Sequence, residues 1–238
     1  MRRRTMLPAA AAVLALAAPA TGAAKSPRLG SGSKTCSPKP GANCAGVKAK
    51  GKFKFHGDLS RINLKGARLV DANLSGANLY RANLAGADLR GATIDRADLR
   101  GANLSNADLR GAKIRRSDLR NAKLRRADAG PRRTGKKSRT HGSADVPECS
   151  TYCEEAQFVD SDLEGAGLPY ANLTGANLTG ANLTGANVTG ANLTGANVTG
   201  ANLTGANLTS AVFTNATGCL GAGGAQPYGA LDGLGCRN

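Results

Sequence analysis

The sequence predicts an all-β fold, a four-sided solenoid built in two arrays of five-residue units. Large apolar residues, mostly Leu, recur every five positions over fourteen units from Leu59 to Leu124 and over twelve units from Phe158 to Phe213. Ala stands two positions before most of these centres, and aromatic residues make up only 3% of the chain. A period of five fits neither a helix nor a flat strand, and the intervening Gly, Asn and Thr disfavour a helix.

The five-residue period suggests a chain that turns a corner in every unit. If each turn is about ninety degrees, four sides close a coil of about twenty residues, and coils stack at about the 4.8 Å spacing of paired strands. Leu then fills the centre, and Ala lets the backbone approach closely. Asn or Asp before the centre can bond turn backbone, and Gly tolerates the corner dihedrals. Because one coil leaves both faces open, stability is expected to come from stacking.

The N-terminal 24 residues have the layout of a secretory signal peptide. Three Arg precede an apolar stretch of small residues that ends near Gly22 to Ala24. The stretch is shorter than the roughly 20 residues of a membrane span, which argues against the alternative of an anchor. We therefore expect an exported protein, located in the periplasm, the cell envelope or outside the cell. Residues 25–56 are expected to form a mobile basic leader, with regular structure beginning near Phe53 and Phe55.

The repeats divide the remaining chain into four segments. The first array covers residues 57–129, and residues 130–155 form a basic linker or extruded loop rich in Pro and Gly. The second array covers residues 156–217, and residues 218–238 form a Gly-rich tail. Two separate solenoids and one solenoid with the central segment looped out are both open. The single solenoid is favoured because stacking the arrays hides two apolar coil ends.

Six cysteines lie outside the recognised repeats, which after export indicates disulfides. We favour the local pairs Cys36–Cys44, Cys149–Cys153 and Cys219–Cys236 among the possible connectivities. The alternative is a metal site at Cys149 and Cys153, but their spacing matches no strong zinc signature and no His follows closely. No metal and no cofactor is expected.

The units ADLRG, ANLSG and ANLTG resemble those of the pentapeptide-repeat family, over residues 57–128 and 156–217. The resemblance implies a right-handed quadrilateral β-helix with the Leu and Ala positions inward. Some members bind DNA gyrase by imitating the charge of DNA. This chain has the opposite charge in its charged half and is expected to leave the cytoplasm, so gyrase is not expected as its partner. The family hosts several roles, and the resemblance names none of them for this chain.

Charge is sorted along the sequence. Residues 25–148 hold 28 basic and 10 acidic residues, whereas residues 149–238 hold one Arg and six acids. Arg often follows the centre in the first array, and Asp often precedes it. These arginines form either a neutralised, solvated face or an anion-binding face. Tyr80 is the one aromatic residue within the array, which leaves little for base stacking. The candidate anion-binding residues are Arg90, Arg100, Arg110, Arg115, Arg120 and Arg125.

The second array repeats an outward Asn and Thr around each buried centre, as in Asn172-Leu-Thr174. Asn and Thr are either ordinary outward residues or a regular lattice that binds another lattice, such as ice or crystalline polysaccharide. The same triplets spell glycosylation sequons. Only His56 and His141 are present, and a repetitive array offers no unique pocket, so we expect no enzyme.

The sequence therefore predicts an exported structural or interaction protein that presents a regular surface. The alternative is a polyanion-binding module that acts through the basic N-terminal half on an envelope polymer, an anionic lipid or nucleic acid. Another protein as partner and end-to-end self-association are further expectations that the sequence leaves open.

Overall fold

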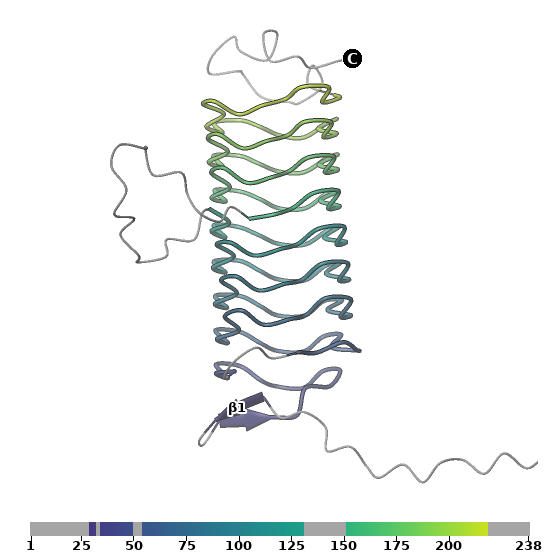
Figure 1. Ribbon diagram of the computed structural model, residues 1–238, viewed down its shortest axis with the longest axis vertical. Coiled ribbons are helices and arrows are strands. Elements are labelled where there is room, and N and C mark those ends of the chain that lie inside the picture. The colour runs from purple at the N-terminus through teal and green to yellow at the C-terminus, as the bar shows by residue number, and fades with distance from the viewer. Residues whose placement is uncertain (1–28, 32–33, 50–53, 131–150, 219–238) are drawn as a thin grey trace, which may run out of the picture.

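The computed structural model describes residues 29–31, 34–49, 54–130 and 151–218. They form a rod of stacked coils with a small hairpin at its N-terminal end (Figure 1). The hairpin pairs β1 (Leu29–Ser31) with β2 (Lys34–Cys36) in antiparallel register, with Leu29 opposite Cys36. In the rest of the described chain each side of a coil contributes a single bridge residue, because a side is only five residues long.

Each side of a coil pairs in parallel with the same side of the next coil, twenty residues later. Asp58 pairs with Asn78, and Asn78 with Asp98. Leu59 donates its backbone N–H to the carbonyl of Asn78 at 2.7 Å, and Asn78 donates to the carbonyl of Gly57 at 2.9 Å. Because such bridges recur every five residues, each coil has four sides, as the period predicts.

The centres and the Ala positions form one continuous apolar column. Leu79, Leu84 and Leu99 have no exposed surface, and the Ala positions from Ala67 to Ala216 are at most 4% exposed. Burying each Leu contributes roughly 1.5–3 kcal/mol. Ser117 replaces Ala without leaving a polar group unpaired, since its hydroxyl donates to the carbonyl of Ile94 at 2.7 Å.

The corner after each centre uses the left-handed backbone region. Gly101 has φ of 64°, and Gly is the usual residue there. Asn106, Arg96 and Tyr170 occupy equivalent corners with φ of 58°, 57° and 58°. A side chain at such a corner costs about 1–2 kcal/mol relative to the ordinary helical region, so these positions carry strain that stacking must hold.

The ladder crosses from the first array into the second without a break. Lys113 pairs with Tyr152 and Asp128 with Gly167, so the interval between partners is 39 residues here, whereas the other described bridges join residues 20 apart, or 19 at Lys54 and Asn73. The two arrays therefore form one solenoid. Thr151 to Glu155 belong to a coil rather than to the expected linker, because Thr151 takes the Ala place and donates its hydroxyl to Leu109 O at 3.0 Å.

The solenoid also begins within residues 25–56, which were expected to form a mobile leader. Asn43 pairs with Asn63 and Lys48 with Arg68, and Cys44 and Val47 are 2% exposed. Residues 42–46, ANCAG, are themselves a five-residue unit with Cys at the centre. A small or polar centre hides the period from a search for large apolar residues. The predicted start of regular structure near Phe53 is therefore wrong, because the coil begins about two five-residue units earlier, at residue 42.

Candidate functional site

The six arginines predicted as an anion-binding face stand on the sides of the first array beside carboxylates. Four of them follow the centre of a unit whose Asp precedes it, and each makes a two-pronged bond to that Asp. Arg90 binds Asp88 through Nε and Nη2, both at 2.8 Å. The same arrangement recurs at Arg100, Arg110 and Arg120.

Stacking brings three of these arginines, Arg90, Arg100 and Arg110, close to a second carboxylate one coil away. Arg90 Nε lies 3.4 Å from Asp108 Oδ2, and Arg110 Nε lies 3.5 Å from Asp128 Oδ2. The charges therefore alternate along the rod in two columns, on the sides that carry Leu89 and Leu99. Sequence spacing revealed the pair within a unit, whereas the pair between coils needs the twenty-residue stacking.

The ion pairs shift the acidity of the carboxylates. The hydrogen bond from Arg90 lowers the pKa of Asp88, and the bond from Arg100 lowers the pKa of Asp98 in the same way. For Asp118 burial works in the opposite direction, yet its bonds to Arg120 leave the pKa lowered. Each Asp therefore remains charged at neutral pH and screens its arginine.

Arg115 and Arg125 complete the predicted set and pair across coils. Arg115 Nη2 lies 2.7 Å from Asp95 Oδ2. Arg125 pairs with Asp162 at 3.3 Å and with Glu164, both of which belong to the second array. All six predicted residues thus have carboxylate partners, and the structure spreads them over all four sides of the rod rather than onto one face. This geometry favours the neutralised interpretation.

The contact between the arrays joins oppositely charged coils. Residues 112–130 hold seven basic and two acidic residues, and residues 151–170 hold five acids and no base. Arg116 Nε lies 2.9 Å from Glu155 Oε2, and Arg125 makes its pairs with Asp162 and Glu164 on another side of the same coil. These five acids are the only ones in residues 151–218, so the charge sorting of the sequence becomes local neutralisation at the join.

A shallow cleft of about 590 Å³ follows the corner next to this join. Arg115 and Arg116 form its middle, and Glu154 stands at one end. Glu154 Oε1 accepts a bond from Asn172 at 2.9 Å, whereas its buried Oε2 has no hydrogen-bond partner among the described atoms. The lining has three guanidinium groups and three carboxylates and is balanced in charge. It consists of Ser75, Gly76, Asp95, Arg96, Arg115, Arg116, Glu154 and Glu155.

Basic residues without a carboxylate partner gather at the N-terminal end, where the sequence analysis placed no site. Their side chains are exposed, and none makes an ion pair with an acid in the described ranges. Tyr80 lies between two guanidinium groups, those of Arg81 at 5.1 Å and Arg100 at 5.6 Å. We call this set the basic collar: Lys48, Lys54, Arg61, Lys65, Arg68 and Arg81.

The second array carries an internally bonded surface. In each unit from Asn172 to Thr209 the Thr hydroxyl donates to the Asn side-chain oxygen at 2.6–2.7 Å, and the Thr N–H donates to the same oxygen. The Asn oxygen thus accepts two hydrogen bonds, and the amide groups of Asn172, Asn177 and Asn182 donate to side chains of the preceding coil. Two complete coils of this kind stack between Ala171 and Ser210.

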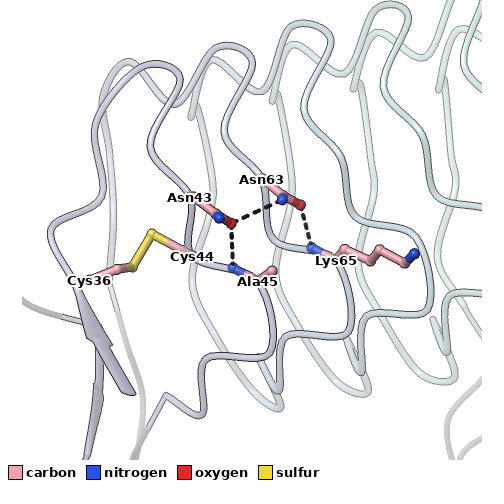
Figure 2. The surroundings of a disulfide bond; sticks show 6 residues. All are labelled: Cys36, Asn43, Cys44, Ala45, Asn63 and Lys65. Carbon is pink, nitrogen blue, oxygen red and sulfur yellow. Dashed lines mark hydrogen bonds between the residues drawn. A yellow bond between two sulfur atoms is a disulfide. The ribbon is translucent and has the colours of Figure 1, made fainter. Parts of the chain in front are cut away.

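Of the three expected disulfides, the structure confirms one and contradicts another. Cys36 and Cys44 are bonded, which ties β2 to the first coil (Figure 2). Cys153 is a free, buried thiol, so the expected Cys149–Cys153 bond is wrong. Cys153 occupies the centre of a unit and points into the apolar column, where burial raises the pKa of its thiol. Cys149, Cys219 and Cys236 lie outside the described residues.

Of the two histidines of the sequence, His56 lies among the described residues. His56 Nδ1 lies 2.7 Å from the carbonyl of Ser75, at an exposed position on the second coil, and His141 lies outside the described residues. Within the described ranges no three His, Cys, Asp or Glu side chains cluster as metal ligands. No helix in that part of the chain is long and apolar enough to cross a membrane.

Comparison with known proteins gives a consistent result. A family model described as pentapeptide repeats, in eight copies, matches residues 58–95, 94–128, 156–195 and 191–217. No match was found among curated proteins. Among solved structures, HetL, a pentapeptide repeat protein involved in heterocyst differentiation regulation in Nostoc sp. strain PCC 7120, is 32% identical. The match covers 72% of this chain and 70% of HetL, with a TM-score of 0.43.

Two further solved structures extend the comparison. A trypsin-treated form of QnrB1, a plasmid-mediated fluoroquinolone resistance protein, is 18% identical over 78% of this chain and 89% of its own, with a TM-score of 0.51. A pentapeptide repeat protein from the Arabidopsis thaliana thylakoid lumen is 32% identical over 54% of this chain and 69% of its own, with a TM-score of 0.36. At its low identity the QnrB1 match supports a shared fold only.

Proposed function

Because the chain belongs to the pentapeptide-repeat family, we propose that it is an exported structural or interaction protein built as a right-handed quadrilateral β-helix. The proposal places no chemical reaction on its surface. Residues 1–24 direct export, and the disulfide between Cys36 and Cys44 fits an oxidising compartment. The rod then presents its sides to a partner in the cell envelope or outside the cell.

The observation that carries the proposal is the pairing of side chains within and between units. Arg90 and its counterparts are bonded to Asp, and each Thr of the second array is bonded to its Asn. Side chains held in this way give a rigid, regular surface. Rigidity favours binding because little side-chain entropy is lost on contact.

Affinity capture from the cell envelope tests the proposal. The exported protein, carrying a C-terminal tag, is recovered with its partners at low and at high salt. A partner retained at high salt supports a surface of neutral side chains. Recovery of the protein solely from the cytoplasm, with residues 1–24 intact, contradicts the proposed export.

The basic collar supports a second candidate function, that of a polyanion-binding module. Residues 34–86 hold ten basic and two acidic residues. Binding that is lost at high salt and survives removal of residues 151–238 supports this alternative, because screening weakens phosphate and carboxylate contacts. DNA gyrase remains an unexpected partner for an exported basic chain.

A further inference from the structure

Among the described residues the net positive charge of the rod lies at one end. Residues 87–130 and 151–218 together hold eleven basic and eleven acidic residues, so this part of the rod has no net charge. Residues 34–86 have ten basic and two acidic residues. The rod is therefore neutral along most of its length and strongly positive at the end that carries the β1–β2 hairpin (Figure 1).

Two acids, Asp58 and Asp71, lie at this end of the rod. Asp58 accepts hydrogen bonds from the side chain of Asn78 at 3.0 Å and from Ser60 N–H at 2.9 Å. Asp71 acts electrostatically on Arg90, one coil further along. Arg68 influences Asp88 through charge without forming an ion pair. The collar thus differs physically from the paired arginine columns.

The collar surrounds the rod instead of following one side. Arg61 and Arg81 stand at the corner after the Leu59 side, and Lys65 stands on the Leu64 side. Lys48 and Arg68 pair in the ladder on the third side, and Lys54 lies on the fourth. The collar covers residues 48–81, less than two twenty-residue coils and about 8 Å along the axis, which is within the Debye length of about 10 Å at 0.1 M salt.

From this distribution we infer that the N-terminal end of the rod docks on an anionic lipid bilayer, with the axis standing away from the membrane. A linear polyanion that follows one side meets only one or two collar residues. A planar surface across the end of the rod meets residues from all four sides together. The neutral remainder of the rod supplies no comparable attraction that would lay it flat on the surface.

Lys65 illustrates why the collar residues can be changed without disturbing the coil. Its backbone N–H donates to Asn63 Oδ1 at 3.2 Å, and Asn63 in turn donates to Asn43 Oδ1 at 3.0 Å (Figure 2). The Lys65 ammonium takes no part in these bonds. Arg61 and Arg68 are likewise exposed, so their neutral variants retain the fold.

The test compares two triple variants of the full chain that lose the same charge. One is Arg61→Gln, Lys65→Gln and Arg68→Gln in the collar. The control is Arg100→Gln, Arg110→Gln and Arg120→Gln in the paired columns. Each protein is sedimented with phosphatidylcholine vesicles that contain or lack phosphatidylglycerol, and circular dichroism checks the fold.

We expect the unaltered chain to bind vesicles that contain phosphatidylglycerol and to ignore pure phosphatidylcholine. Each collar residue near the surface contributes about fivefold, so the collar variant loses about a hundredfold in partition coefficient. The control variant loses less than about tenfold, because its arginines are paired and lie farther from the end.

Equal losses in the two variants overturn the inference. So does binding of soluble polyphosphate by the collar without binding to anionic vesicles, since that result assigns the collar to a linear polymer. The inference rests on the proposed export for its biological setting alone. Vesicle binding and cell fractionation are separate measurements, so failure of one is distinguishable from failure of the other.

Discussion

At the scale of the residue, two backbone places decide whether a unit fits. The centre must be apolar because its side chain enters a column with no water, as at Leu99. The corner must accept positive φ, which Gly101 does without strain and Asn106 does at a cost. The remaining positions face solvent and can vary. They hold many Arg and Lys residues in the first array and mostly Asn and Thr in the second.

Replacing Leu99 with Ala tests the column. Leu99 is fully buried, so the substitution removes apolar contact and leaves a cavity. We expect the free energy of unfolding to fall by about 3 kcal/mol. Val212→Ala is the control, since Val212 is 44% exposed and should change stability by less than about 0.5 kcal/mol. Denaturant unfolding measures both, and equal effects contradict a packed column.

The corner is tested by a pair of opposite substitutions. Gly101→Ala places a Cβ at φ of 64° and about 3.4 Å from Arg81 Cγ, and it should destabilise the rod by about 1 kcal/mol. Asn106→Gly relieves the same strain and should stabilise it, although the greater freedom of unfolded Gly offsets part of the gain. Thermal unfolding compares the two. A destabilised Asn106→Gly variant shows that its side chain contributes more than strain costs.

At the scale of the element, a single coil is held by its neighbours. Its sides are too short to form strands of their own, and every bridge links it to the coil before or after. Side-chain pairs reinforce the same direction, as Arg110 does by contacting Asp108 in its own unit and Asp128 in the next coil. The join between the arrays depends on this most, because five acids of one coil face seven cations of the other.

Acid should weaken these contacts. The pKa values of Asp88, Asp98, Asp118 and Glu155 are lowered in the folded protein by their arginines, from ordinary values of 3.8 for Asp and 4.5 for Glu. Their contribution is therefore present above about pH 4.5 and is lost as the pH falls through the folded values. We expect the melting temperature to decrease as the pH is lowered from about 4.5, and to decrease more steeply at low salt.

A variant supplies the control for this pH dependence. Arg116→Gln removes the partner of Glu155 and should flatten the decline without altering the neutral-pH fold. A melting temperature that is constant from pH 7 to about pH 3 in both proteins contradicts a role for the ion pairs.

At the scale of the whole molecule, the rod tolerates an interruption because stacking depends on the register of coils rather than on chain continuity. Gly130 occupies the place of Arg110, since Asp128 aligns with Asp108, and Tyr152 takes up the ladder again opposite Lys113, 39 residues later instead of 20. The nineteen residues 131–149 therefore lie outside the twenty-residue period.

Deleting residues 131–149 should leave a continuous solenoid. With Ser150→Gly added for the corner, the chain regains its twenty-residue interval, and we expect a melting temperature equal to or above that of the parent. Deleting residues 131–150 is the control, because one residue fewer shifts every later side chain out of place. Similar melting curves for the two deletions indicate that the second array folds without stacking on the first.

Much of this molecule follows directly from the order of its residues. The five-residue spacing of Leu and the Ala before it dictate which side chains enter the column, since a backbone with regular corners has no other way to bury them. The same pattern overlooked the unit around Cys44, whose centre is small, and it misassigned Cys153, which occupies a Leu place. A search for large apolar residues every five positions misses a unit whose central residue is small.

The functional surface depended on contacts between coils. Sequence alone placed Arg90 beside Asp88 in one unit, but only the stack brings Asp108 to the same guanidinium and Glu155 to Arg116. Among the described residues the net positive charge lies at the N-terminal end, away from the predicted arginines. The sequence by itself thus determined the coil, because burial is periodic along the chain. Tertiary structure decided which charges are paired between coils, because those ion pairs join residues 18 to 39 positions apart.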